Sequence, residues 1–346
     1  MLRKCFDLLR NSPFTVPMYA DKGELLVLAA FLPSAVCQKT YFLTDCAPSN
    51  GRGQAYLLRY IMSYVNCKLC PRACGVNRAA GQAGFCGAPA ATMVAKAMVH
   101  KWEEPVLAGQ GGSGAIFFGG CNLGCAYCQN RAISQKAVGA PTDGPALRKI
   151  MEDLIAQGAE NIDLVTATPY LPTLLEALAE PLSVPVVYNT GGYESSAAIA
   201  MLDGKVDIYL PDLKYADTAL AKALSNAPDY FSVATAAILQ MFRQVGPVQW
   251  SGSKITKGVI IRHLILPGQV ENSLKILDWI GQTFQKGDVL VSLMRQYTPM
   301  PGLAAPYDRT VTEDEYQAVL SWMFLNDLDG FTQEQTAADT SFIPDF

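Results

Sequence analysis

Residues 119–130 read Gly-Gly-Cys-Asn-Leu-Gly-Cys-Ala-Tyr-Cys-Gln-Asn, and they place Cys121, Cys125 and Cys128 in C-x3-C-x2-C spacing on one short loop. Three thiolates are one fewer than the four that normally hold a [4Fe–4S] cubane, so one iron would remain open to an outside ligand. Three buried free cysteines, a zinc site, and a disulfide with one spare thiol are the alternatives. A structural zinc site needs four protein ligands, and this loop offers no fourth.

The loop resembles the cluster-binding motif of the radical S-adenosylmethionine (SAM) superfamily at each cysteine. In that family, the amino and carboxylate groups of SAM chelate the open iron. The resemblance implies that Cys121, Cys125 and Cys128 hold a [4Fe–4S] cluster together with SAM. It also implies that Tyr127, just before the third cysteine, lies near the adenine of SAM.

Six short apolar runs follow one another along the chain from residue 113 onward, and they have the composition of strands buried on both faces. The runs are 115–118, 162–166, 184–188, 206–210, 258–266 and 289–293. Helical patterns at 147–155, 171–179 and 273–284 lie between them. Thr312 and Glu315 form a capping-box pattern before a helix that runs to about Leu325.

Alternating strands and helices predict an α/β fold with parallel strands joined by right-handed crossovers. A doubly wound open sheet would show the same alternation, and the cysteine loop favours a partial (β/α)6 TIM-type barrel with an N-terminal Cys-rich metal-binding extension. We expect an N-terminal extension without an assigned role at 1–60 and a Cys-rich metal-binding segment at 61–112. The radical SAM core, with a C-terminal helical and strand extension, is expected at 113–346.

Polar residues follow the second and third predicted strands, and in α/β barrels the chemistry gathers at the carboxyl ends of strands. The superfamily often has a Gly-Gly-Glu run after its second strand, where it binds the SAM amino group. That run is absent here, and Thr168 is the candidate in its place; a simple turn is the alternative. Asn189 and Thr190 end the third strand before two glycines, which let a ligand approach the backbone unless the segment is only a turn.

The fourth and fifth predicted strands carry charged residues. Asp212 and Lys214 resemble the Asp-x-Lys run of glycyl-radical-enzyme activases, which implies that they hold the carboxylate and ribose side of SAM, with a monovalent cation as a further candidate. A surface ion pair is the alternative. Arg262 lies inside an apolar strand, where its charge needs a partner, either the SAM carboxylate or a protein carboxylate. His263 should point to the opposite face of the sheet in a structural role.

A second group of cysteines precedes the loop: Cys67, Cys70, Cys74 and Cys86, in C-x2-C-x3-C-x11-C spacing. Four thiolates suit either a structural Zn²⁺ or an auxiliary [4Fe–4S] cluster, and the spacing leaves both open. Cys5, Cys37 and Cys46 are left over, and we interpret them as free buried thiols.

The composition excludes several function classes. The 346 residues have a formal net charge of −4 and no long Lys/Arg run, so we expect no nucleic-acid partner. His100 and His263 are the two histidines, and neither lies in a recognisable nucleophile context. Clustered cysteines indicate a reducing compartment, hence a cytoplasmic location. The apolar run Leu25–Val36 is shorter than the roughly 20 residues that span a bilayer, so no membrane association is expected.

Residues 65–345 as a whole resemble iron–sulfur proteins similar to pyruvate formate-lyase-activating enzyme. The runs that carry this likeness are 69–74, 103–105, 112–118, 188–194, 212–215 and 296–299. It implies a radical SAM oxidoreductase that receives an electron from a ferredoxin or flavodoxin and cleaves SAM to a 5′-deoxyadenosyl radical. A glycyl radical enzyme is the substrate that the likeness favours.

Two other activities stay open at this stage. One is radical modification of a small metabolite or peptide. The other is a non-catalytic Fe–S electron carrier, although carriers usually saturate their clusters with protein ligands. The sequence assigns no catalytic residue.

Overall fold

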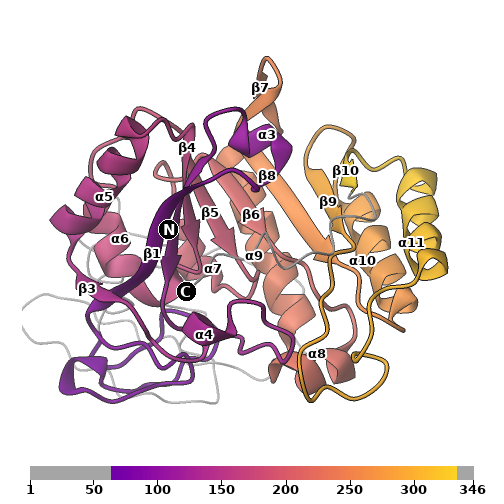
Figure 1. Cartoon of the computed structure of the whole chain (residues 1–346), viewed down its shortest axis with the longest axis horizontal. Coiled ribbons are helices and arrows are strands. Elements are labelled where there is room, and N and C mark those ends of the chain that lie inside the picture. Colours follow the sequence, from indigo (N-terminus) through magenta and orange to yellow (C-terminus); the bar gives the residue numbers. More distant parts are fainter. Residues whose placement is uncertain (1–63, 333–346) are drawn as a thin grey trace, which may run out of the picture. The chain divides into compact units, whose positions relative to one another are not determined.

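The computed structural model describes residues 64–332. Its strands form one sheet in the spatial order β10-β9-β8-β6-β5-β4-β2-β1-β3, and β7 pairs with β8 off this path (Figure 1). The 1–60 extension, its three cysteines and the apolar run Leu25–Val36 lie outside the described residues.

The six strands predicted from the sequence are confirmed, and they pair in parallel through the centre of the sheet. They are β2 (Ser113–Phe118), β4 (Asn161–Val165), β5 (Val186–Thr190), β6 (Ile208–Pro211), β8 (Lys254–Leu264) and β9 (Leu290–Met294). β10 (Gly330–Thr332) adds a further parallel strand beside β9. Because both faces of these strands are covered, their sequences are nearly continuous apolar runs.

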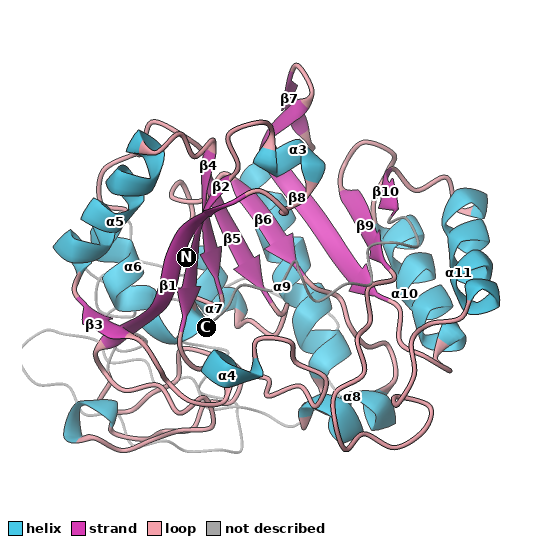
Figure 2. Cartoon of the chain, viewed as in Figure 1, coloured by secondary structure: helices cyan, strands magenta, loops and turns pink. Residues whose placement is uncertain are grey.

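Helices connect the parallel strands, as Figure 2 shows. They are α5 (Gly144–Ala156), α6 (Leu171–Ala177), α7 (Ser196–Ala200), α8 (Thr218–Ser225), α9 (Tyr230–Val245), α10 (Val270–Thr283) and α11 (Glu313–Leu325). The helices predicted from the 3.6-residue periodicity correspond to α5, α6, α10 and α11, and Thr312 caps α11 in the predicted capping box with Glu315. The helices α7, α8 and α9 were not predicted.

The order of the parallel strands distinguishes the two predicted architectures. Neighbours in the sheet follow chain order from β2 to β9, without the reversal that defines a doubly wound sheet. The sheet does not close, because its two ends are the edge strands β3 (Ala140–Thr142) and β10. The α/β fold with a partial (β/α)6 TIM-type barrel is therefore confirmed.

Three antiparallel strands of the sheet were not predicted, and one of them is β3, which pairs antiparallel with β1. β1 (Thr92–His100) pairs antiparallel with β2, and β7 (Gln249–Ser251) pairs antiparallel with β8. Many residues of β1 are only half-buried, so its sequence lacks the continuous apolar character of the central strands. The chain between the two cysteine groups thus contributes the strand that lies between β2 and the edge strand β3. The proposed three-segment division of the chain stays a prediction.

The two faces of the sheet pack against different elements. On one face, Phe118, Tyr188 and Ile261 join the main core with the helices α5, α6, α9 and α10. On the other face, strand residues such as Ile208 pack with Val106 and other residues of α3 (Pro105–Ala108) in a smaller core. Alternation along each strand therefore separates a helix-facing core from an interior face that is free to carry polar residues near the strand ends.

The carboxyl ends of the strands meet a layer of loops that holds the short helix α4 (Arg131–Ser134) and also α8 (Figure 1). Tyr230, fully buried at the start of α9, connects two of these loops. Its hydroxyl lies 2.9 Å from the carbonyl oxygen of Gly191 and 2.7 Å from that of Asp212, and it accepts the N–H of Lys214 at 3.1 Å. One phenol thus fixes the ends of β5 and β6 relative to each other.

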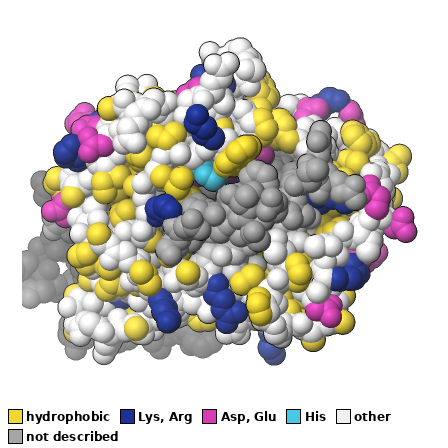
Figure 3. Space-filling view, viewed as in Figure 1, with side chains coloured by type: hydrophobic (Ala, Val, Ile, Leu, Met, Phe, Trp, Pro, Cys, Tyr) yellow, Lys and Arg dark blue, Asp and Glu magenta, His cyan; other side chains and the backbone are white. Residues whose placement is uncertain are grey.

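The surface shows mixed charge. On the face drawn in Figure 3, Lys and Arg side chains are interspersed with acidic and uncharged ones and form no single basic patch. Within the described part of the chain, none of the helices combines the length and the hydrophobicity that crossing a membrane requires.

We expect the substitution Tyr230→Phe to lower the free energy of unfolding by about 1–3 kcal/mol, because buried backbone groups lose their partner. Tyr209→Phe is the matched control: its hydroxyl bonds only the half-buried Gln244, which water can reach. Thermal unfolding of both variants and the wild type measures the effect. Equal losses in the two variants would contradict the special role of Tyr230.

Candidate iron–sulfur centre and cofactor site

The two leading glycines attach the cysteine loop to strand β1 and to helix α4. The N–H of Gly119 bonds the carbonyl oxygen of Met93 at 2.9 Å, and the N–H of Gly120 bonds that of Ile133 at 2.8 Å. Gly120 has φ +85°, and a Cβ there would lie 2.7 Å from the carbonyl oxygen of Cys86. Glycine is therefore required where the first cysteine group passes directly against the loop.

The three sulfurs of the loop lie within electrostatic reach of one another. Burial, followed by the charges of Cys125 and Cys128, raises the pKa of Cys121 to about 12. Burial also raises the pKa of Cys128, with Cys125 as the next cause. Thiols in this situation stay protonated unless a cation compensates their charge, and bound metal deprotonates them. This donor set fits a cationic cluster held on one face by three sulfurs.

Each cysteine of a cubane binds a different iron, so its sulfurs need not converge on one point. In the described range, 64–332, no three Cys, His, Asp or Glu side chains are placed to hold a single metal ion.

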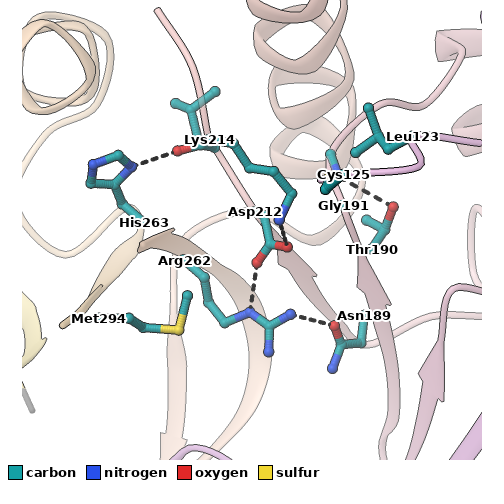
Figure 4. Close-up of polar contacts among 12 residues, drawn as sticks. Leu123, Cys125, Asn189, Thr190, Gly191, Asp212, Lys214, Arg262, His263 and Met294 are labelled. Atoms are coloured by element: carbon teal, nitrogen blue, oxygen red, sulfur yellow. Dashed lines mark hydrogen bonds and ion pairs between the residues drawn. The ribbon is translucent and has the colours of Figure 1, made fainter. Parts of the chain in front are cut away.

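A charged network lies at the ends of β5, β6 and β8, beside the loop (Figure 4). Asp212 accepts from Arg262 Nε at 2.9 Å and from Lys214 Nζ at 2.5 Å, and Arg262 Nη2 donates to Asn189 Oδ1 at 2.6 Å. The structure thus brings together four of the residues predicted to bind the cofactor. Arg262 pairs with protein carboxylates, as one of its two predicted alternatives required.

The electrostatics of this network follow from its burial. Burial raises the pKa of Asp212, but Arg262 and Lys214 outweigh this effect and hold it below its usual value. Burial lowers the pKa of Lys214, and Asp212 followed by Cys125 raises it above its usual value. The ammonium group of Lys214 is therefore close enough to the cluster loop to respond to the charge of Cys125.

Carboxyl groups on the interior face extend the network, and sequence reasoning gave them no role. Arg262 also pairs with Glu103 at 3.6 Å, and Asn189 Nδ2 donates to Asp163 Oδ2 at 3.2 Å. Burial and then Glu103 raise the pKa of Asp163 well above its usual value. Burial likewise raises the pKa of Glu104, which accepts from Ser292. In the sequence, Asp163 is an acidic residue within the apolar run of β4, and this was the signal that could have indicated its place in the network.

Thr168 and Thr190, two further predicted cofactor ligands, are joined by a buried carboxyl group that sequence reasoning missed. Both hydroxyls donate to Glu194 Oε1 at 2.5 Å, while Glu194 Oε2 has no hydrogen-bond partner. Burial raises the pKa of Glu194 to about 7. The roles predicted for the two threonines stay predictions, and Glu194 joins them at the ends of β4 and β5.

Gly192 packs against the backbone of Asp212, rather than leaving its own backbone open to a ligand. It has φ +80°, and a Cβ there would lie 2.1 Å from the carbonyl oxygen of Asp212. His263, as predicted, faces away from the site: its ring nitrogens bond the carbonyl oxygen of Leu213 at 2.7 Å and Ser273 Oγ at 2.8 Å. Burial lowers the pKa of His263 to about 4.

Tyr127 points into the core from the cysteine loop. Its hydroxyl lies 2.7 Å from that of Tyr215, and its ring packs against that of Tyr297 with centroids 5.8 Å apart. Burial raises the pKa of both Tyr127 and Tyr215 well above the usual value. The side chain of Tyr127 is thus held by these neighbours, and its contact with the adenine of SAM stays a prediction.

Arg72 joins the first cysteine group to the cluster loop. Its Nε donates to the carbonyl oxygen of Asn122 at 2.8 Å, and its Nη2 donates to that of Ser225 at 3.0 Å. The guanidinium stacks on the ring of Phe85, 3.8 Å from the centroid. A bidentate fork with an aromatic partner is an arrangement that lysine cannot reproduce.

The four cysteines of the first group also influence one another. Burial raises the pKa of Cys70 to about 12, and the charges of Cys86 and Cys74 contribute. Burial likewise raises the pKa of Cys86, with contributions from Cys67 and Cys74. Metal binding by this group stays a prediction, as does the choice between zinc and a second cluster.

We expect Glu194→Gln to remove a pH dependence of stability. Burial raises the pKa of Glu194 from 4.5 to about 7. Between these two pH values, the folded protein therefore keeps a proton on Glu194 that the unfolded chain releases. The resulting stabilisation is complete below about pH 4.5 and is lost as the pH rises to about 7, a change of about 3 kcal/mol.

The measurement is the free energy of unfolding of wild type and variant across this pH range, with the exposed Glu180→Gln as control. A wild-type-minus-variant difference that stays constant with pH would show that Glu194 titrates like a carboxylate in water.

Comparison with known proteins identifies a "4Fe-4S single cluster domain" over residues 107–180, which contains the cysteine loop. The uncharacterized protein MJ0674 of Methanocaldococcus jannaschii is 30% identical over 247 residues, covering 68% of this chain and 67% of that protein.

Among solved structures, a radical SAM methyltransferase from Sphaerobacter thermophilus has a TM-score of 0.44 at 14% identity and covers 63% of this chain. SuiB of Streptococcus suis, bound to SAM, has a TM-score of 0.42 at 13% identity and covers 62% of this chain. A domain of a pyruvate-formate lyase-activating enzyme from Bacteroides vulgatus has a TM-score of 0.33 at 10% identity and covers 47% of this chain. The chain spans 65%, 48% and 89% of these three structures, and likenesses this distant assign no activity.

The cluster domain around the three-cysteine loop and the relative that matches over two thirds of its length lead to one assignment: the chain belongs to the family of the uncharacterized protein MJ0674, and it contains a 4Fe-4S single cluster domain whose cysteine loop lies at the carboxyl end of β2.

Proposed function

We propose that this protein cleaves SAM reductively at a [4Fe–4S] cluster held by Cys121, Cys125 and Cys128. The observation that carries the proposal is the position of the three-thiol loop beside the network of Asp212, Lys214, Arg262 and Asn189. An open iron on the loop would face charged groups that suit a zwitterionic ligand. When bound, the cluster and SAM together supply one-electron cleavage of the sulfonium and a 5′-deoxyadenosyl radical for hydrogen abstraction.

The residues of the network have separate roles in this proposal. Asp212 holds the cationic groups of Lys214 and Arg262 side by side, so that neither must reorganise when a carboxylate arrives. Asn189 fixes the second edge of the Arg262 guanidinium. The side chains of Asp212, Lys214 and Arg262 are 13–17% exposed, and this partial exclusion of water strengthens their contacts.

The interior carboxyl groups give the space beneath the network a polar lining. Glu103 and Asp163 lie on the side of Arg262 and Asn189 that faces the barrel interior. Asp163 Oδ1 has no hydrogen-bond partner.

The finer assignments form part of the same proposal. The Asp-x-Lys run at Asp212 and Lys214 supports a glycyl-radical-enzyme activase, with a ferredoxin or flavodoxin as reductant in the reducing cytoplasm. The first cysteine group would hold a zinc ion or a second cluster, and a monovalent cation at Asp212 is a further candidate.

The test is anaerobic reconstitution followed by dithionite and SAM, with 5′-deoxyadenosine as the product measured. The wild type should form it, Cys125→Ala should lose both the cluster signal and the product, and Asp212→Asn should keep the cluster but weaken SAM binding at least tenfold, because two cations lose their shared partner. An intact cluster that gives no product from the wild type would indicate an electron carrier instead.

A second prediction concerns the first cysteine group. The reconstituted wild type should contain metal beyond the roughly four irons of one cluster, and this excess should disappear in Cys70→Ser but persist in Cys125→Ala. Metal analysis distinguishes about four additional irons from one zinc. Identical metal content in wild type and Cys70→Ser would contradict metal binding by this group.

A further inference from the structure

A chain of three buried hydroxyl groups ends at the sulfur of Cys125. Ser225, the last residue of α8, donates from Oγ to Cys125 Sγ at 3.0 Å although the two residues are 100 positions apart. The hydroxyl of Tyr215 lies 2.7 Å from Ser225 Oγ, and that of Tyr127 lies 2.7 Å from the hydroxyl of Tyr215. All four residues are buried, with Ser225 1% exposed and Tyr215 0% exposed.

Counting protons gives the chain a direction. A metal-bound thiolate only accepts hydrogen bonds, so Ser225 donates its single hydroxyl proton to the sulfur of Cys125. Ser225 Oγ must then accept from Tyr215, whose own proton is thereby used, and Tyr215 must accept from Tyr127. All three O–H dipoles therefore point toward Cys125, and hydrogen bonds in such a chain strengthen one another.

The other two loop sulfurs are contacted by backbone N–H groups and by one serine hydroxyl. Cys121 Sγ accepts from the backbone N–H of Leu123 at 3.4 Å, and Cys128 Sγ lies 3.3 Å from Ser134 Oγ. The bond from Ser225 is the shortest of the three, and within residues 64–332 it is the one backed by further side-chain donors.

The position of Ser225 does not depend on its hydroxyl. The N–H of Ala126 bonds the carbonyl oxygen of Leu224 at 2.8 Å, and Arg72 donates to the carbonyl oxygen of Ser225. These backbone contacts hold the end of α8 against the loop. Removing the hydroxyl should therefore delete its hydrogen bonds with Cys125 and Tyr215 and leave the loop in place.

Hydrogen bonds to cluster sulfurs are among the factors that set the reduction potential, because the reduced cluster carries more negative charge. We propose that Ser225, oriented by Tyr215 and Tyr127, stabilises the reduced cluster and raises its reduction potential. The proposal rests on the cluster of the proposed function but not on SAM cleavage. Ser225 acts on the cluster through a ligand, so it is a positioning residue.

The experiment is a redox titration of the reconstituted protein followed by electron paramagnetic resonance, using the signal that Cys125→Ala abolishes. Ser225→Ala should shift the reduction equilibrium about tenfold toward the oxidised form, a midpoint about 59 mV more negative. Tyr215→Phe should shift it about threefold in the same direction, and Ser225→Thr, which keeps a hydroxyl, should restore the wild-type midpoint. Tyr297→Phe is the matched control, because its ring touches Tyr127 but its hydroxyl bonds Tyr307.

An unchanged midpoint in Ser225→Ala with the cluster intact would overturn the proposal. If Ser225→Ala fails to load a cluster, the comparison of Tyr215→Phe with Tyr297→Phe decides: equal midpoints overturn the proposal and a more negative midpoint in Tyr215→Phe supports it. If the predicted shifts occur in a protein that makes no 5′-deoxyadenosine, they would support the role of Ser225 and its hydroxyl chain and refute the proposed function. Normal SAM cleavage with unchanged midpoints would support the proposed function and refute the role of Ser225.

Discussion

The parallel pairing of six strands is the constraint on which the site depends. Strands that run in one direction place their carboxyl ends at the same edge of the sheet, so distant segments meet there. The register is specific: Thr190 lies beside Pro211, and Asp212 forms a bridge with Arg262. A shift by one residue in either pairing would turn Asn189 or Arg262 toward the helix-covered face and break the network.

Buried charge explains why this network is so fully connected. An unpaired ion in the interior is costly, so Arg262 is in contact with Asp212, Asn189 and Glu103 at once. The carboxyl groups outnumber the cations nearby, and the raised pKa of Asp163 shows how the excess is resolved, through a retained proton. The same reasoning applies to Glu194, which is buried without a cation among its hydrogen-bond partners.

The two cysteine groups form one continuous region of the molecule. Arg72 connects the first group to the cluster loop and to the end of α8, and Gly120 lets the backbone at Cys86 pass directly beneath the loop. Whatever the first group binds will therefore affect the orientation of the cluster loop. The hydroxyl chain approaches Cys125 through α8, so three separate segments of the chain surround one set of sulfurs.

The sequence by itself determined the cysteine spacing, the six apolar strands and the polar residues at their ends, because these are local patterns of period and composition. It also indicated Asp212, Lys214, Asn189 and Arg262 as cofactor candidates, and the structure brings them into contact because parallel strands share one carboxyl edge. Only the tertiary structure decided the roles of Glu194, Tyr230 and Ser225, whose partners include residues far away in the chain. Such contacts leave no local pattern: a buried serine at the end of a helix looks the same in sequence whether it faces leucine or the sulfur of a cluster ligand.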